Sequence, residues 1–253
     1  MRTREDSLPL RSSAPVTFWL IAANVAVAAM GWFGDADALI QRWGLVPAAF
    51  GDAPLTLVTH AFLHGGLLHL ALNLLMLGFL GRHLEPMMGS LRFAAVYAVG
   101  LVAAALAQVA WSPDSAVPMV GASGAISAAL GAAVLLAPST RIFLLTPFTL
   151  FIPVPMRLRT FGWVWAALQL VGLAVADPFG GGVAYMAHLG GFLAGLGAIE
   201  ALRFSVRRRR DAARRAYQGR VHPVGRGPAP ATGFRTYFVT DSSGRTYAFH
   251  ESS

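Results

Sequence analysis

Four polar side chains stand inside long apolar segments of this 253-residue chain, where such groups are rare and usually functional. They are Ser123, His188, His69 and Asn73. A serine beside a histidine is an activated nucleophile, because the imidazole takes the hydroxyl proton as the oxygen attacks a carbonyl carbon. His69 and Asn73 are four residues apart and share one helix face, from which both can donate hydrogen bonds to an oxyanion. These residue types therefore favour acyl transfer.

These residues lie at similar depths along their apolar segments. If the second, fourth and sixth segments all run inward, His69, Ser123 and His188 each lie about one turn to a turn and a half below the external end. The polar groups then share one layer near the outer surface. No carboxylate stands where it would orient His188, so the pattern predicts a catalytic dyad of Ser123 and His188, with no metal and no cofactor.

Glycines flank the serine and repeat near the histidine. Gly121 and Gly124 surround Ser123, and Gly191 and Gly195 form a small-xxx-small face on the last apolar segment. Such faces let two membrane helices approach closely. We therefore expect the fourth and sixth segments to pack tightly enough for Ser123 and His188 to form a hydrogen bond.

The composition indicates a membrane protein. Charged residues make up 13% of the chain, whereas soluble domains carry about 25%. The net charge is +8, and every basic residue is arginine. The arginines gather at the ends of apolar segments and in the C-terminal tail, which suits membrane topology and lipid headgroups better than nucleic acid. The chain has no cysteine, which excludes disulfides and thiolate chemistry.

Six apolar segments are long enough to be membrane spans. They lie at approximately 16–33, 66–82, 91–111, 119–137, 160–176 and 183–202. Six crossings put nearly all of the arginines outside the apolar segments on one side, namely Arg2, Arg4, Arg11, Arg82, Arg92, Arg141, Arg157, Arg159 and Arg207–Arg210. Because positive charge marks the cytoplasmic side, we expect an all-α, multi-pass protein of the cell membrane with both termini cytoplasmic.

The pattern divides the chain into three domains. Residues 1–15 form a cytoplasmic N-terminal segment, 16–203 the six-span membrane domain, and 204–253 a basic cytoplasmic tail. Within the membrane domain, 34–65 and the proline-interrupted stretch 142–156 are expected to be interfacial loops. In the tail, alternation around an Asp-Ser-Ser-Gly turn predicts a β-hairpin over 234–251, which needs an unidentified partner because a lone hairpin is marginally stable.

Other interpretations fit parts of the pattern. Ser123 alone is compatible with a serine that bonds back to its own helix. A zinc site is the alternative interpretation of His60, His64 and His69. The glutamate of a His-Glu-x-x-His metalloprotease is missing, however. The alternative functions are a non-proteolytic protein that binds membrane helices and a small proton-linked transporter. Neither needs a serine paired with a histidine.

Together the residues resemble the rhomboid family of intramembrane serine proteases. The resemblance covers roughly residues 55–200 and rests on four motifs: Gly121-Ala122-Ser123-Gly124, the His64…His69…Asn73 run, Glu85-Pro86-Met87-Met88-Gly89, and Ala187-His188 with Gly191 and Gly195.

The resemblance implies a six-helix rhomboid bundle that cleaves transmembrane protein substrates. Its implied roles are Ser123 as nucleophile, His188 as general base, and His69 and Asn73 as oxyanion stabilisers. Structural or water-retaining roles fall to the remaining motif residues, which are His60, His64, Glu85, Gly89, Gly121, Gly124, Gly191 and Gly195. Two positions depart from many relatives: Leu55-Thr56 replaces a Trp-Arg pair, and Ser127 replaces an aromatic residue that packs on the histidine.

Overall fold

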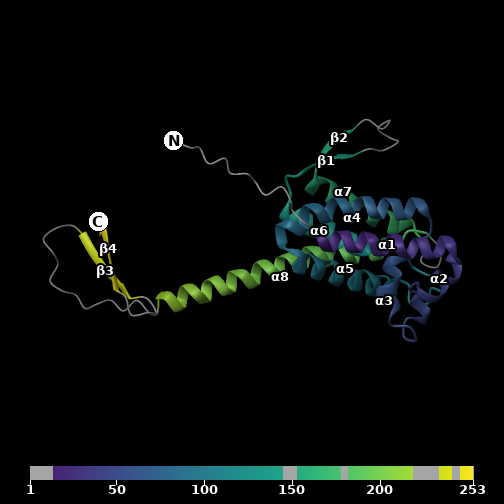
Figure 1. Cartoon of the computed structure of the whole chain (residues 1–253), viewed down its shortest axis with the longest axis horizontal. Helices are drawn as coiled ribbons and strands as arrows, with labels where there is room; N and C mark the ends of the chain where they lie inside the picture. The colour runs from purple at the N-terminus through teal and green to yellow at the C-terminus, as the bar shows by residue number, and fades with distance from the viewer. Residues whose placement is uncertain (1–13, 145–152, 178–181, 219–233, 241–245, 253) are drawn as a thin grey trace. The chain divides into compact units, whose positions relative to one another are not determined.

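The structure is a computed structural model (Figure 1), and it describes residues 14–144, 153–177, 182–218, 234–240 and 246–252. The expected N-terminal segment lies almost entirely outside these residues. The described elements in chain order are α1 Pro15–Phe33, α2 Ala36–Trp43, η1 Pro47–Ala49, α3 Thr56–Thr59, η2 His60–Phe62, α4 Leu67–Met88, α5 Ser90–Trp111, α6 Ser123–Leu136, β1 Arg141–Leu144, β2 Val154–Arg157, α7 Leu158–Val175, α8 Tyr185–Gln218, β3 Phe234–Thr240 and β4 Thr246–Ser252.

The apolar helices among the described residues differ in length. Five are long and apolar enough to cross a membrane, namely α1, α4, α5, α7 and α8. The fourth expected span is the 14-residue α6, which at 1.5 Å per residue is about 21 Å long, shorter than a hydrocarbon core of about 30 Å. The helix begins at Ser123, four residues after the expected start of the span at approximately 119, and residues 119–122 are extended or turning backbone.

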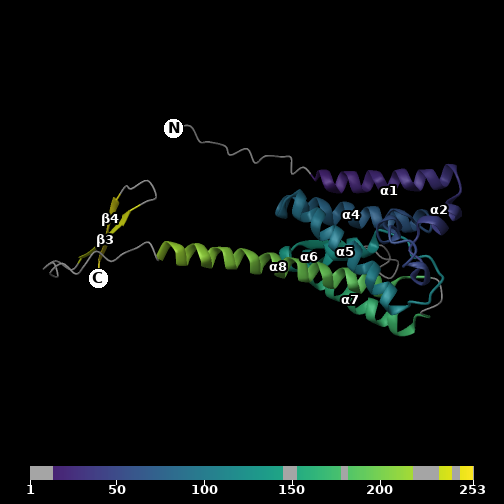
Figure 2. The same cartoon turned by 90° about the horizontal axis from the view of Figure 1, so that it is seen from below.

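Helix α6 occupies the centre of the bundle. It contacts α4, α5 and α7, and Figure 2 shows α1 beside α4 at one edge and α7 at the other. Almost all of its side chains are buried, including Ala128, Ala129, Ala132 and Ala133. A helix of alanine and glycine presents little bulk, so its neighbours pack against its backbone.

Two glycines of α8 lie directly against the backbone of α6. A Cβ atom on Gly191 would collide with the carbonyl oxygen of Gly124, and one on Gly195 would collide with the carbonyl oxygen of Ala128. Backbone atoms within a helix cannot move aside independently. The distance between α6 and α8 is therefore set by the absence of side chains at residues 191 and 195.

The buried carboxylate of Glu85 lies near the C-terminal end of α4 and joins this helix to α1 and α5. It accepts hydrogen bonds from Val16 N at 2.9 Å, from Thr17 N at 2.9 Å, from Thr17 Oγ1 at 2.8 Å, and from Ser90 Oγ at 2.7 Å. The first N–H groups of a helix have no partner within it, so Glu85 caps α1 from a neighbouring helix. Gly89, at φ +83°, makes the turn from α4 to α5 in a region that favours glycine.

The first loop, residues 34–66 between α1 and α4, is hydrogen-bonded to residues 119–122, which lead into α6. Leu45 and Met119 exchange two backbone hydrogen bonds, at 3.0 and 2.8 Å, and Gly121 N donates to His60 O at 2.9 Å. These bonds fix the first loop in place. They attach the loop on either side of Leu55-Thr56, the pair that departs from Trp-Arg.

Two other sequence expectations need correction. The expected loop 142–156 is flanked by strands, with β1 paired antiparallel to β2 from Arg141↔Arg157 to Leu144↔Val154; residues 145–152 lie outside the described residues. Helix α8 continues to Gln218, past the expected end at 202, because the arginines and alanines that follow are good helix formers.

The chain divides into two compact units, Met1–Glu200 and Ala201–Ser253. In the second unit, β3 pairs antiparallel with β4 from Phe234↔Ser252 to Thr240↔Thr246. The turn at 241–244 and the preceding Pro/Gly linker fall outside the described residues.

The two glycines of α8 at 195 and 197 provide a matched test of this packing. Gly195→Val should lower the thermal midpoint clearly, because overpacking a tight contact costs about 1–3 kcal/mol and the opposing atoms are backbone. Gly197→Val adds the same side chain to the same helix where nothing lies within 4 Å, and its midpoint should stay near that of the parent. Equal melting curves for both variants would contradict the packing described for α6 and α8.

Candidate active site

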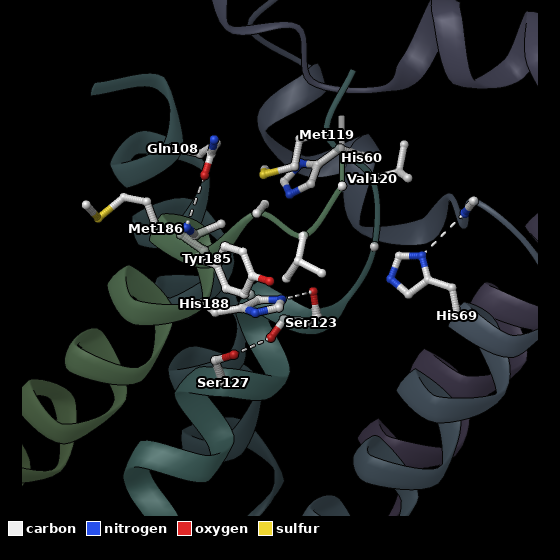
Figure 3. Close-up of a pocket in the computed structure, with 18 of the residues that line it drawn as sticks. His60, His69, Gln108, Met119, Val120, Ser123, Ser127, Tyr185, Met186 and His188 are labelled. Carbon is white, nitrogen blue, oxygen red and sulfur yellow. Dashed lines mark hydrogen bonds between the residues drawn. The ribbon is translucent and has the colours of Figure 1, made fainter. Parts of the chain in front are cut away.

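Ser123 and His188 meet at one end of the bundle, where α6 and α8 begin. Ser123 is the first residue of α6, and His188 lies in the first turn of α8. The hydroxyl Oγ of Ser123 lies 2.8 Å from Nε2 of His188, and Figure 3 shows the two side chains facing each other. The structure thus brings together two residues that are 65 positions apart in the sequence, at a hydrogen-bonding distance suited to proton transfer.

The second nitrogen of His188 is also hydrogen-bonded. Its Nδ1 lies 2.8 Å from the amide oxygen Oε1 of Gln169 on α7. The indole ring of Trp165, one turn earlier on α7, packs beside the imidazole with ring centroids 5.6 Å apart. Sequence reasoning missed both residues, although a glutamine within an apolar span was itself a signal of a functional or structural contact.

Ser127 does not fill the place of the aromatic residue seen in many relatives. Its hydroxyl donates to the carbonyl oxygen of Ser123 at 2.6 Å, within the first turn of α6. Trp165 supplies an aromatic ring beside His188 instead, from a different helix. Although residue 127 is not aromatic, His188 thus still has an aromatic neighbour.

Helix α5 holds the start of α8 through Gln108. The amide oxygen of Gln108 accepts a hydrogen bond from the backbone N–H of Ala187 at 3.3 Å, and its Nε2 donates to Ser112 at 3.1 Å. Figure 3 shows Gln108 beside the residues that precede His188. This polar residue, also missed from the sequence, fixes the backbone that carries the imidazole.

His69 lies on α4, across from the serine. Its Nδ1 accepts a long hydrogen bond, 3.4 Å, from Gly65 N, which puts the proton of the neutral ring on Nε2. Nε2 lies beside Gly121, whose φ is +118° and where a Cβ would meet the ring at 2.8 Å. That same point is 3.7 Å from Ser123 Oγ. The His69 N–H is therefore directed toward the region next to the serine.

Asn73 is buried one turn below His69. Its Nδ2 donates to the carbonyl oxygen of His69 at 2.8 Å, while its Oδ1 is buried without a hydrogen-bond partner. It also lines the same pocket as Ser123. One amide proton of Asn73 is thus engaged within α4, and the second is left for another acceptor.

The other two histidines differ in position. His60 is buried in η2, where its Nδ1 lies 2.7 Å from Thr56 O, and burial lowers its pKa below the usual value. His64 lines a separate small pocket beside α1 and α2 and touches the His69 ring edge-on, with centroids 5.1 Å apart. Burial and the nearby His69 lower the pKa of His64 to about 4. Both rings are neutral near pH 7.

A pocket of about 910 Å³ opens above the serine. Its walls come from α4, α5, α6, α7 and α8 and from the loop before α6, and they include Ser123, His188, His69 and Asn73. Most of the surrounding residues are apolar, with polar groups converging at one place. This arrangement is typical of a binding or catalytic site.

Comparison with known proteins places the chain among relatives of one family. The family model described as the Rhomboid domain matches residues 52–203. Rhomboid protein 1, mitochondrial, of Saccharomyces cerevisiae is 28% identical over 72% of this chain and 51% of its own length. Rhomboid protease GluP of Bacillus subtilis is 34% identical over 58% of this chain and 25% of its own length.

RHOMBOID-like protein 5 of Arabidopsis thaliana is 32% identical over 58% of this chain and 44% of its own length. The chain thus spans about half or less of the length of these curated relatives. The matched region contains Ser123, His188, His69 and Asn73, and it makes up more than half of the chain. These matches confirm the resemblance found in the sequence: the chain belongs to the rhomboid family.

Proposed function

We propose that this protein is an intramembrane serine endopeptidase that cleaves membrane-anchored proteins near the external surface. The observation that carries the proposal is the 2.8 Å hydrogen bond between Ser123 Oγ and His188 Nε2, at the floor of a pocket in a rhomboid-family chain. The name of the Bacillus subtilis relative, a rhomboid protease, supports the same activity.

The reaction proceeds by acyl transfer. Ser123 Oγ attacks the scissile carbonyl carbon while its proton passes to His188 Nε2, and the tetrahedral intermediate collapses as His188 returns that proton to the leaving amine. Water then attacks the carbonyl carbon of the acyl-enzyme while His188 accepts a proton from it, and His188 returns that proton to Ser123 Oγ as the ester bond breaks. A free carboxylate and a free amine are the products.

The developing oxyanion is stabilised from two sides. The N–H groups in the first turn of α6 have no partner within the helix, and the helix dipole favours negative charge there. His69 Nε2–H contributes from α4, and the second amide proton of Asn73 lies one turn farther along. Gly121 permits this arrangement because a side chain at that position would occupy the space beside His69.

The substrate is a transmembrane segment that loses its helical structure at the site. A peptide bond inside a helix is shielded by its own hydrogen bonds, so segments with glycine, proline or small residues are the favoured substrates. A non-proteolytic helix binder and a proton-linked transporter are less favoured, because neither uses a hydroxyl bonded to an imidazole.

The proposed topology has six crossings, with the short α6 completing the set. The arginines Arg207–Arg210 are exposed on α8, where they suit anionic headgroups at the cytoplasmic surface. We also propose a partner for the C-terminal hairpin of β3 and β4, because a lone two-stranded hairpin is marginally stable in water.

Ser123→Ala and His188→Ala should each abolish cleavage of a membrane-anchored reporter in proteoliposomes, with losses of roughly 10⁴–10⁶-fold, because members of one catalytic unit fail together. Ser205→Ala and His83→Ala are matched controls, since both parent side chains are exposed and bond within their own helices. Cleavage retained by the purified Ser123→Ala variant would exclude the proposed nucleophile.

His69→Ala should lower kcat by roughly 10²–10³, the usual effect of removing one oxyanion donor, with little change in KM. Asn73→Ala should lower kcat less, because its amide already donates to the His69 carbonyl. Leu75→Ala, an exposed change on the same helix, serves as the control. Full activity of the His69→Ala variant would show that the imidazole does not touch the oxyanion.

Reporter fusions test the topology. A fusion after Ser253 should report a cytoplasmic location, and an insertion after Asp114, between α5 and α6, should report an external one, because the arginines gather on the opposite side from Asp114. An external signal from the C-terminal fusion would overturn the six-crossing proposal.

A further inference from the structure

Helix α7 presents two side chains to the catalytic histidine. Trp165 and Gln169 are one turn apart and therefore lie on the same face. The indole packs beside the His188 ring, and Gln169 Oε1 lies 2.8 Å from His188 Nδ1. Gln169 is buried, with 8% of its side chain exposed, so water does not compete freely for this contact.

The orientation of the Gln169 amide follows from its second hydrogen bond. Its Nε2 donates to the carbonyl oxygen of Trp165 at 3.3 Å. A flipped amide would place two oxygens together at Trp165 and remove the acceptor from His188. The amide oxygen therefore faces Nδ1, and a carbonyl oxygen can only accept a hydrogen bond.

This contact determines which nitrogen of His188 carries the proton. A neutral imidazole has one N–H and one bare nitrogen. Because Gln169 Oε1 requires a donor, the proton is on Nδ1, and Nε2 is left bare as the acceptor for the Ser123 hydroxyl. That is the tautomer a general base needs, since the other tautomer would present an N–H to the serine.

We propose that Gln169 is a positioning residue, which holds His188 in the tautomer and ring orientation that activate Ser123. The proposal rests on the proposed function and extends the predicted dyad to a Ser–His–Gln arrangement. The amide is neutral, which suits a site within the membrane because an unpaired buried carboxylate is costly there. When the ring gains a proton from serine, the Nδ1–H···O bond becomes charge-assisted and stronger.

Two substitutions separate this role from simple packing. Gln169→Leu keeps a similar volume without the acceptor, and it should lower kcat roughly 10²-fold, the effect of a small misplacement of a reacting group, with KM little changed. Gln169→Glu keeps an acceptor oxygen, and its kcat should remain within about tenfold of the parent. If Gln169 only filled space, the kcat of Gln169→Leu would be higher than that of Gln169→Glu. Leu170→Ala, on the lipid-facing side of α7, should leave kcat unchanged.

The pH dependence provides a readout that packing does not affect. The base must be neutral to act, so the rate rises with pH as the imidazolium loses its proton. A carboxylate at 169 favours the imidazolium, so the half-maximal pH of kcat/KM should be higher for Gln169→Glu than for the parent, and lower for Gln169→Leu. The other titratable side chains that line the pocket, His60, His69, Asp177 and Tyr185, are the same in all variants.

The tautomer can be measured without any activity. In ¹⁵N-histidine-labelled protein in detergent micelles, the His188 signals are those missing from His188→Ala. They should report an Nδ1–H, Nε2-bare ring in the parent and a loss of that tautomer in Gln169→Leu. This result supports the positioning role even if the parent cleaves no reporter, in which case the proposed function alone fails. An unchanged tautomer in Gln169→Leu, or parent-like kcat with an unchanged pH profile, would overturn the proposal.

Discussion

The backbone contact between α6 and α8 is the constraint on which the site depends. Gly191 lies against the Gly124 carbonyl and Gly195 against the Ala128 carbonyl, so no side chain separates the two helices. Ser123 and His188 come from these same helices and reach each other at 2.8 Å. Proton transfer tolerates little variation in that distance, and a contact set by two backbones varies less than one set by flexible side chains.

The rest of the bundle keeps α6 in place, although α6 is too short to be a typical span. Its N-terminus is approached through Gly121, whose backbone N–H bonds to the His60 carbonyl in the first loop. At the other end of α4, Glu85 ties α1 and α5 together through four hydrogen bonds. Long outer helices therefore surround a short inner one, and Ser123, at the first residue of that inner helix, lies within a pocket.

The sequence was most informative where residue type and depth agreed. Ser123 and His188 were predicted to be neighbours because both lie just inside the external end of an inward-running segment, and the glycines at 191 and 195 predicted which face of α8 meets α6. Rhomboid membership followed from the same motifs. The pairing and the glycine face depend on helical periodicity and depth, which a sequence displays directly, whereas membership of the family rested on the resemblance of the motifs.

Other features depend on information that periodicity does not contain. The contact from Gln169 to His188 requires the rotation of α7 about its axis, which the apolar sequence leaves open. The true start of α6 depends on the positive φ of Gly121, and the end of α8 on arginines that read equally well as helix or tail. Residues 142–156 were expected to form a loop because prolines interrupt them, yet prolines also occur in short strands, as in β2.

The activation of Ser123 is the central claim, and a fluorophosphonate probe tests it most directly. The probe forms a covalent bond only with a serine whose oxygen is made nucleophilic by a neighbouring base. In the detergent-solubilised protein, peptide mapping by mass spectrometry should locate the label on Ser123, and labelling should disappear in His188→Ala while the melting curve shows a folded protein. A folded parent that remains unlabelled at Ser123, or a His188→Ala variant that labels as fast as the parent, would contradict the account.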